Sequence, residues 1–90
     1  MLFMVIEDFK DADLNHVGER FKRCGRMLPE GVLYVASWME ARGARCNQLM
    51  EALDRAALDS WIGRWSDLVS FEVEEVLASA DFWSKREPGE

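Results

Sequence analysis

The sequence predicts an α+β domain with the element order βαββαβ, which is the ferredoxin-like plan. Three observations predict it. Four strand-like runs are present, at Leu2–Ile6, Val32–Met39, Arg45–Ala52 and Val69–Val76. Two helix-like stretches, Asp13–Cys24 and Arg55–Trp65, separate the first run from the second and the third from the fourth. The second and third runs are joined only by a short connection that contains Gly43, which is typical of a hairpin. We therefore expect a four-stranded antiparallel sheet with both helices on one face.

The first strand-like run, Leu2–Ile6, is apolar at every position. Because successive side chains of a strand point to opposite faces, Leu2, Met4 and Ile6 share one face, and Phe3 and Val5 share the other. A strand that is apolar on both faces is typical of the middle of a sheet, so we expect this run to be a central strand.

The first helix is predicted from an apolar stripe at helical spacing, formed by Leu14, Val17, Phe21 and Cys24. Asp11 or Asp13 is the expected N-cap, and Gly25 is the expected C-terminal stop.

The second strand also has two apolar faces, whereas the third strand is more polar. In the ferredoxin-like order the third strand lies in the sheet interior, beside the first. Polar side chains there need partners, which makes Asn47 and Gln48 conspicuous.

The second helix is predicted from Asp54 as its N-cap and from a stripe at positions i, i+3, i+4 and i+7. The stripe consists of Leu58, Trp61, Ile62 and Trp65. The last strand alternates Val69, Phe71 and Val73 with Glu72 and Glu74, and the alternation fails after Glu74, which suggests a bulge or a strand end.

The chain is expected to form one domain over residues 1–78, followed by a partly disordered tail over residues 79–90. Within the tail, Phe82 and Trp83 are the side chains expected to pack, and Lys85–Glu90 is polar.

Composition excludes several partner classes. The 90 residues carry a net charge of −6, which disfavours binding to a phosphate backbone, so we expect no nucleic-acid partner. No apolar run approaches the roughly 20 residues that span a membrane. The apolar start is typical of a strand and lacks the basic flank and cleavage site of a signal peptide, so a cytoplasmic location is expected.

The cysteines and the histidine give no metal or redox signature. Cys24 and Cys46 are expected to be reduced, buried thiols, with a single disulfide between them as the alternative. His16 is the only histidine, so no zinc cluster is expected. No phosphate loop or nucleophile–base pair is visible, and we expect no cofactor.

Two helices cover only one face of a four-stranded sheet, yet the first two strands are apolar on both faces. The second face therefore needs a cover. We expect a second copy, packed sheet against sheet around a two-fold axis as a dimeric α/β barrel. The alternative is a monomer in which the tail with Phe82 and Trp83 folds over that face.

Several sequence words resemble a bacterial family of small stand-alone proteins classed as a domain of unknown function. They are GRMLPEG at 25–31, YV at 34–35, SW at 37–38, RC at 45–46, QLME at 48–51, WIGRWSDLV at 61–69 and FE at 71–72. The resemblance covers about Met1 to Val76 and leaves the Phe82–Glu90 tail outside. It implies a dimeric α/β-barrel fold and no established activity or catalytic residues. Asn47 departs from the family pattern, which has an aromatic residue there.

Four residues are candidates for a ligand site. Gln48 shares a strand face with Cys46 and Met50, and inside an apolar cavity its amide would orient a small ligand, unless the backbone or a buried water satisfies it. If Glu72 points into the cavity, desolvation would raise its pKa and make it a proton acceptor, whereas on the surface it is an ordinary carboxylate.

Arg26 follows the first helix, where its planar fork would pair with Glu72 or with an anionic ligand. The competing interpretation is a solvent-facing charge at the helix end or a structural ion pair. Trp38 has the ring area to stack on a flat ligand, although a core or dimer-interface role is the competing interpretation. His16 lies on the polar side of the first helix and is expected to be solvated.

Three functions remain open from the sequence alone. The first is a protein that binds a small hydrophobic or aromatic molecule in a barrel cavity. The second, by analogy of fold only, is a cofactor-independent monooxygenase- or isomerase-like enzyme with Glu72 as its base. The third is a ligand-free interaction module whose cavity is filled by side chains.

Overall fold

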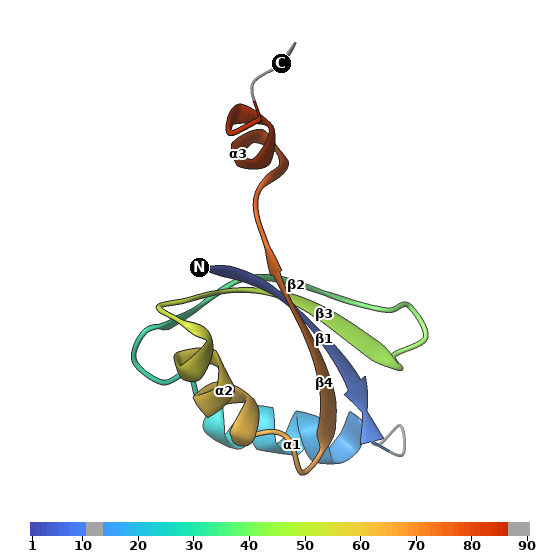
Figure 1. The fold of residues 1–90 in the computed structure, drawn as a ribbon. Coiled ribbons are helices and arrows are strands. Elements are labelled where there is room, and N and C mark those ends of the chain that lie inside the picture. The colour runs from blue at the N-terminus through green and yellow to red at the C-terminus, as the bar shows by residue number, and fades with distance from the viewer. Residues whose placement is uncertain (11–13, 87–90) are drawn as a thin grey trace.

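The computed structural model describes residues 1–10 and 14–86 and shows the ferredoxin-like order (Figure 1). Its elements are β1 (Leu2–Phe9), α1 (Leu14–Cys24), β2 (Val32–Met39), β3 (Arg45–Ala52), α2 (Arg55–Gly63), β4 (Val69–Val76) and α3 (Ser79–Ser84). The strands form one sheet in the order β2-β3-β1-β4, and all neighbours are antiparallel. The predicted fold class is confirmed, with β1 as a central strand. The expected caps Asp11 and Asp13 lie outside the described residues.

Two element boundaries and the position of one strand irregularity differ from the prediction. β1 extends past Ile6 to Phe9, because it remains paired with β3 as far as Asp8 and with β4 as far as Phe9. α2 ends at Gly63, where the N–H groups of Arg64 and Trp65 bond to carbonyls three residues earlier. The expected irregularity in β4 is absent, and the register shift lies instead in β2, between Tyr34 and Ala36.

The core lies between one face of the sheet and α2. Phe3, Val5 and Met50 supply the sheet side, and Leu58 and Trp61 supply the helix side, all of them buried. The predicted stripe of α2 is therefore the one that packs. Its predicted cap is also present, because the Asp54 carboxylate accepts a hydrogen bond from the Ala57 N–H at 2.8 Å.

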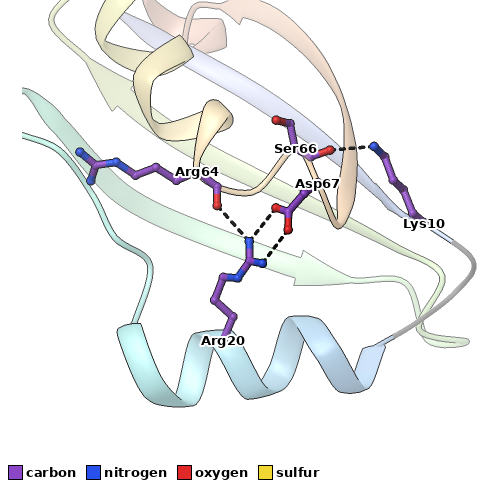
Figure 2. Close-up of polar contacts among 5 residues, drawn as sticks. All are labelled: Lys10, Arg20, Arg64, Ser66 and Asp67. Atoms are coloured by element: carbon purple, nitrogen blue, oxygen red, sulfur yellow. Dashed lines mark hydrogen bonds and ion pairs between the residues drawn. The ribbon is translucent and has the colours of Figure 1, made fainter.

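α1 is attached to the rest of the domain through its polar side. The guanidinium of Arg20 donates two hydrogen bonds to the Asp67 carboxylate, at 2.7 and 2.6 Å, and one to the Arg64 carbonyl at 3.1 Å (Figure 2). This guanidinium lowers the pKa of Asp67 to about 2. Nearby, the Lys10 ammonium donates to the Ser66 carbonyl at 2.7 Å. These bonds tie α1 and the end of β1 to the turn between α2 and β4.

The predicted burial of the α1 stripe is wrong for most of its members. No residue of α1 is fully buried, and Leu14 and Phe21 remain 41% and 44% exposed. Val17 alone packs against the core. Cys24 is exposed and Cys46 is buried, and both thiols are free, so the expectation of two buried thiols holds for Cys46 only.

The other face of the sheet, which we call the open face, has no cover among the described residues. The register places Leu2, Met4, Ile6, Leu33, Trp38 and Leu49 on it. The described part of the tail, residues 79–86, does not fold over it. α3 stands away from the sheet beyond the end of β4 (Figure 1), and its Trp83 is 63% exposed. None of the described helices is long and apolar enough to cross a membrane.

Candidate functional site

A pocket of ≈ 390 Å³ lies between α1 and the helix-covered face of the sheet. Its apolar wall comes from α1, from Phe9 of β1 and from Met39 of β2. The polar or ionisable side chains on the wall are Arg26, Ser37, Cys46 and Gln48. The pocket exists because α1 is held by its polar side while its apolar stripe stands off the sheet.

Arg26 is positioned through its own backbone. Its carbonyl accepts hydrogen bonds from the indole N–H groups of Trp61 and Trp65, both at 3.0 Å. Its two neighbours have left-handed backbones, with φ of +65° at Gly25 and 57° at Met27. A positive φ is free for glycine and costs energy for methionine, so the surrounding contacts must hold this turn in place. The turn after α1 is therefore anchored on the tryptophans of α2 and its C-terminal turn.

The Arg26 side chain reaches the pocket between aromatic residues of α1 and β2. Its guanidinium carbon lies 3.6 Å from the Tyr34 ring centroid and 5.1 Å from that of Phe21. Its Nε donates to the Gln48 Oε1 at 3.4 Å. The Tyr34 hydroxyl in turn shares a 2.8 Å hydrogen bond with the Ser37 hydroxyl.

Behind Gln48 lies a buried carboxyl group, Glu7, which is 7% exposed. The side chains of Gln48 and Cys46 hydrogen-bond to it. Burial raises the pKa of Glu7, although these two hydrogen bonds and the charge of Arg26 oppose the shift. Burial also raises the pKa of the Cys46 thiol to about 11, helped by the neighbouring Glu7, so this thiol is not an activated nucleophile.

Sequence reasoning missed Glu7. The signal was available, because the alternation that buries Phe3 and Val5 places Glu7 next on the same face. The predicted first strand ends at Ile6 and therefore does not include Glu7.

The four predicted site residues separate onto two faces of the sheet. Gln48 and Arg26 meet at the pocket. Glu72 pairs with Ile6 across β1 and β4, and Trp38 pairs with Asn47 across β2 and β3, which places both on the open face. The expected ion pair between Arg26 and Glu72 is therefore not formed, and the carboxyl near Arg26 is Glu7 instead. His16 is exposed, as predicted.

Across residues 1–10 and 14–86, no three His, Cys, Asp or Glu side chains group in a way that could hold a metal ion. The polar groups at and next to the pocket are the Gln48 amide, the Arg26 guanidinium, the Ser37 hydroxyl and the Glu7 carboxyl. Together they can orient a polar substituent and hold or accept a proton.

Replacing Glu7 with glutamine should change how stability depends on pH. The raised pKa of Glu7 means that the folded protein binds this proton more tightly than the unfolded chain does. The contribution of Glu7 is therefore most favourable at acidic pH and is lost as pH rises through its folded pKa. Each tenfold difference in proton affinity between the two states corresponds to about 1.4 kcal/mol. Urea unfolding between pH 4 and 8 should show Glu7→Gln gaining stability over the wild type as pH rises.

Glu72→Gln is the matched control, since it removes an exposed carboxylate from the other face of the sheet. If the stability difference between wild type and Glu7→Gln is flat across this pH range, the burial of Glu7 does not perturb its titration.

Comparisons with known proteins agree with this fold. A family model described as "Domain of unknown function (DUF3303)" matches residues 1–88, and the chain belongs to this family. The match includes α3. The family resemblance therefore extends beyond Val76, where it was expected to end. No curated protein matches the chain.

The solved structures that are similar to it include the following two. One is titled "Crystal structure of antibiotic biosynthesis monooxygenase", with a TM-score of 0.52 and 17% identity over 87% of this chain and 100% of that chain. The other is "Structure of Rv0793 from Mycobacterium tuberculosis", with a TM-score of 0.49 and 20% identity over 89% of this chain and 99% of that one. At this identity the first structure supports the ferredoxin-like fold and no more.

Proposed function

We propose that this member of the DUF3303 family binds a small, largely apolar aromatic molecule in the pocket between α1 and the sheet. The observation that carries the proposal is an apolar pocket of ≈ 390 Å³ with a few convergent polar groups. Ligand sites in proteins are typically about 300–1,000 Å³ and have this kind of lining. A ligand would also cover Leu14 and Phe21, which line the pocket and are 41% and 44% exposed.

Gln48 is the group best placed to orient such a molecule. Its Oε1 accepts from Arg26 and its side chain also bonds to Glu7, so the amide is held from two sides. A polar group that is fixed before binding loses little conformational freedom when a ligand arrives. Gln48 therefore supplies orientation, and the apolar wall supplies affinity.

The test is a binding screen with pocket-filling variants. The probes are 2-naphthamide, 2-naphthoate and anthraquinone, and the readouts are thermal shift and isothermal titration calorimetry. Gly18 lies on the pocket wall, and a Cβ added there meets no atom within 4 Å. Gly18→Leu should fill the pocket and abolish binding. Gly18→Ala is the matched control, because it gives a similar gain in helix propensity and should still bind the probes.

Native mass spectrometry of the protein purified from its own host adds a direct observation, since a retained small-molecule mass would identify the ligand. The proposal fails if no probe binds and no mass is retained. It also fails if Gly18→Leu binds the probes as well as the wild type does, because the binding then occurs elsewhere.

A second candidate function is a cofactor-independent monooxygenase or isomerase. It is favoured by the structural similarity to a protein titled an antibiotic biosynthesis monooxygenase and by the buried carboxyl next to the pocket. The proton acceptor would then be Glu7, reached through Gln48, in place of Glu72 on the open face. Oxygen consumption with a bound aromatic substrate, lost in Glu7→Gln, would support this function, and unchanged turnover would remove it. The third alternative, a ligand-free module, predicts a filled cavity and is less favoured by an open pocket.

We further propose that two copies pack through the open face as a homodimer. Leu33 and Trp38 are 61% and 56% exposed there, beside Met4, Ile6 and Leu49. Contiguous apolar patches of this kind are typical of protein interfaces. The described part of the tail does not provide the cover, since α3 stands away from the sheet (Figure 1).

A further inference from the structure

Building on the proposed ligand pocket, we infer that its ligand is an aromatic anion of the aryl carboxylate class, whose negative oxygens pair with the guanidinium of Arg26.

The first support is that Arg26 lacks a carboxylate partner. Four other arginines each pair with one, with the shortest contacts at 2.6 Å for Arg20, 2.8 Å for Arg45, 2.9 Å for Arg55 and 3.8 Å for Arg42. Within the described chain, the Arg26 side chain makes one hydrogen bond, from Nε to Gln48 at the long distance of 3.4 Å. Its terminal N–H groups are therefore available to a ligand, although the side chain is half-buried.

The second support is the charge of the pocket. Arg26 is the only charged side chain on its described wall. Glu7 lies behind Gln48 and Cys46, and burial raises its pKa, so it is a weaker counter-ion than a surface carboxylate. In a protein of net charge −6, the pocket thus presents a positive charge whose nearest carboxyl, Glu7, is set back from the pocket wall. A buried or half-buried charge favours binding of its opposite.

The third support is the way in which Arg26 is held. The indoles of Trp61 and Trp65 fix its carbonyl, and the rings of Tyr34 and Phe21 flank its guanidinium. A planar fork held in this way matches the two oxygens of a carboxylate. Because the fork is already ordered, little rotamer freedom is lost on binding.

The fourth support is the apolar remainder of the wall, which accounts for the aromatic part of the ligand. Leu14, Val17, Phe21 and Met39 offer a surface for a flat hydrocarbon ring next to Arg26. One charged group at one end and an apolar wall beyond it match a molecule with one anionic head and a ring system.

The test compares two probes with the same ring system, one with an anionic and one with a neutral head group. At pH 7, 2-naphthoate is an anion and 2-naphthamide is its neutral counterpart. Calorimetry on the wild type should show the carboxylate binding tighter by about tenfold or more, as expected for a hydrogen bond between charged groups. Arg26→Gln should remove this preference, and Arg26→Lys should keep only part of it because the fork is lost.

Arg23→Gln is the matched control. It also removes one positive charge near the end of α1, but Arg23 is exposed and is not on the pocket wall. It should leave the preference for the carboxylate unchanged. The Arg26 variants keep the backbone carbonyl that the indoles bind, and circular dichroism checks that they fold.

The outcomes separate this inference from the proposed function. If both probes bind the wild type equally, the pocket function stands and the anion inference is overturned. If neither naphthyl probe binds, the anion inference is overturned, and the proposed function fails with it only if anthraquinone does not bind and no small-molecule mass is retained. If the Arg26 variants do not fold, the comparison of the two probes on the wild type still decides the inference.

Discussion

Trp61→Ala should lower the free energy of unfolding by about 3–5 kcal/mol, the usual cost of truncating a buried large aromatic residue. Trp61 is 1% exposed and packs edge-on against Phe71, with ring centroids 5.9 Å apart. Its indole N–H donates to the Arg26 carbonyl. The substitution therefore leaves a cavity in the core and removes one of the two hydrogen bonds that hold the turn after α1.

Urea unfolding followed by circular dichroism measures this loss. Domains of this size have total stabilities of about 5–15 kcal/mol, so the variant should lose a large share of its stability. Trp83→Ala is the control, because Trp83 lies exposed on α3 and its truncation should change stability by less than about 0.5 kcal/mol. Similar losses in the two variants would show that α2 does not carry the core.

Trp61 also links the core to the pocket. The hydrogen bonds from Trp61 and Trp65 end on the residue whose side chain enters the pocket. Trp61→Phe keeps most of the ring volume and loses the N–H. It should therefore destabilise the fold less than Trp61→Ala does and should still weaken the binding of 2-naphthoate.

Local patterns in the sequence are sufficient to predict the sheet. β2, β3 and β4 have the bounds that the sequence predicts, whereas β1 extends past its predicted end to Phe9. The Asp54 cap and the Gly25 stop were also predictable, since both depend only on neighbours along the chain.

The candidate site was only partly predictable. Gln48 could be found because an amide in a central strand is unusual. The placement of Glu72 on the open face was implicit in its alternation with Val69, Phe71 and Val73, which face the helices. Applying that alternation strictly would have removed Glu72 from the pocket.

Other features of the site depend on contacts between distant parts of the chain. Periodicity shows which stripe of α1 is apolar but not how far the helix stands from the sheet, and that distance creates the pocket. It is set by polar bonds such as those between Arg20 and Asp67, which are 47 residues apart (Figure 2). The bonds from the indoles to the Arg26 carbonyl likewise cross 35 and 39 residues.

Trp38→Glu should convert the proposed homodimer into a monomer. The wild type is expected to show a dimer mass in native mass spectrometry and in light scattering at micromolar concentration. Trp38 projects from β2 onto the open face, in the same row as Asn47 and Ile6. In a sheet-to-sheet dimer a carboxylate at this position would be buried without a partner, at a cost of several kcal/mol.

The fold of each copy should survive Trp38→Glu, because Trp38 contributes no buried core surface within one chain. Ser60→Glu is the matched control, since it adds the same charge to an exposed position on α2, which lies on the other side of the sheet, and it should remain a dimer. A monomeric wild type would overturn the dimer proposal. A dimeric Trp38→Glu would show that the two copies meet elsewhere, with the exposed α3 as the next surface to test.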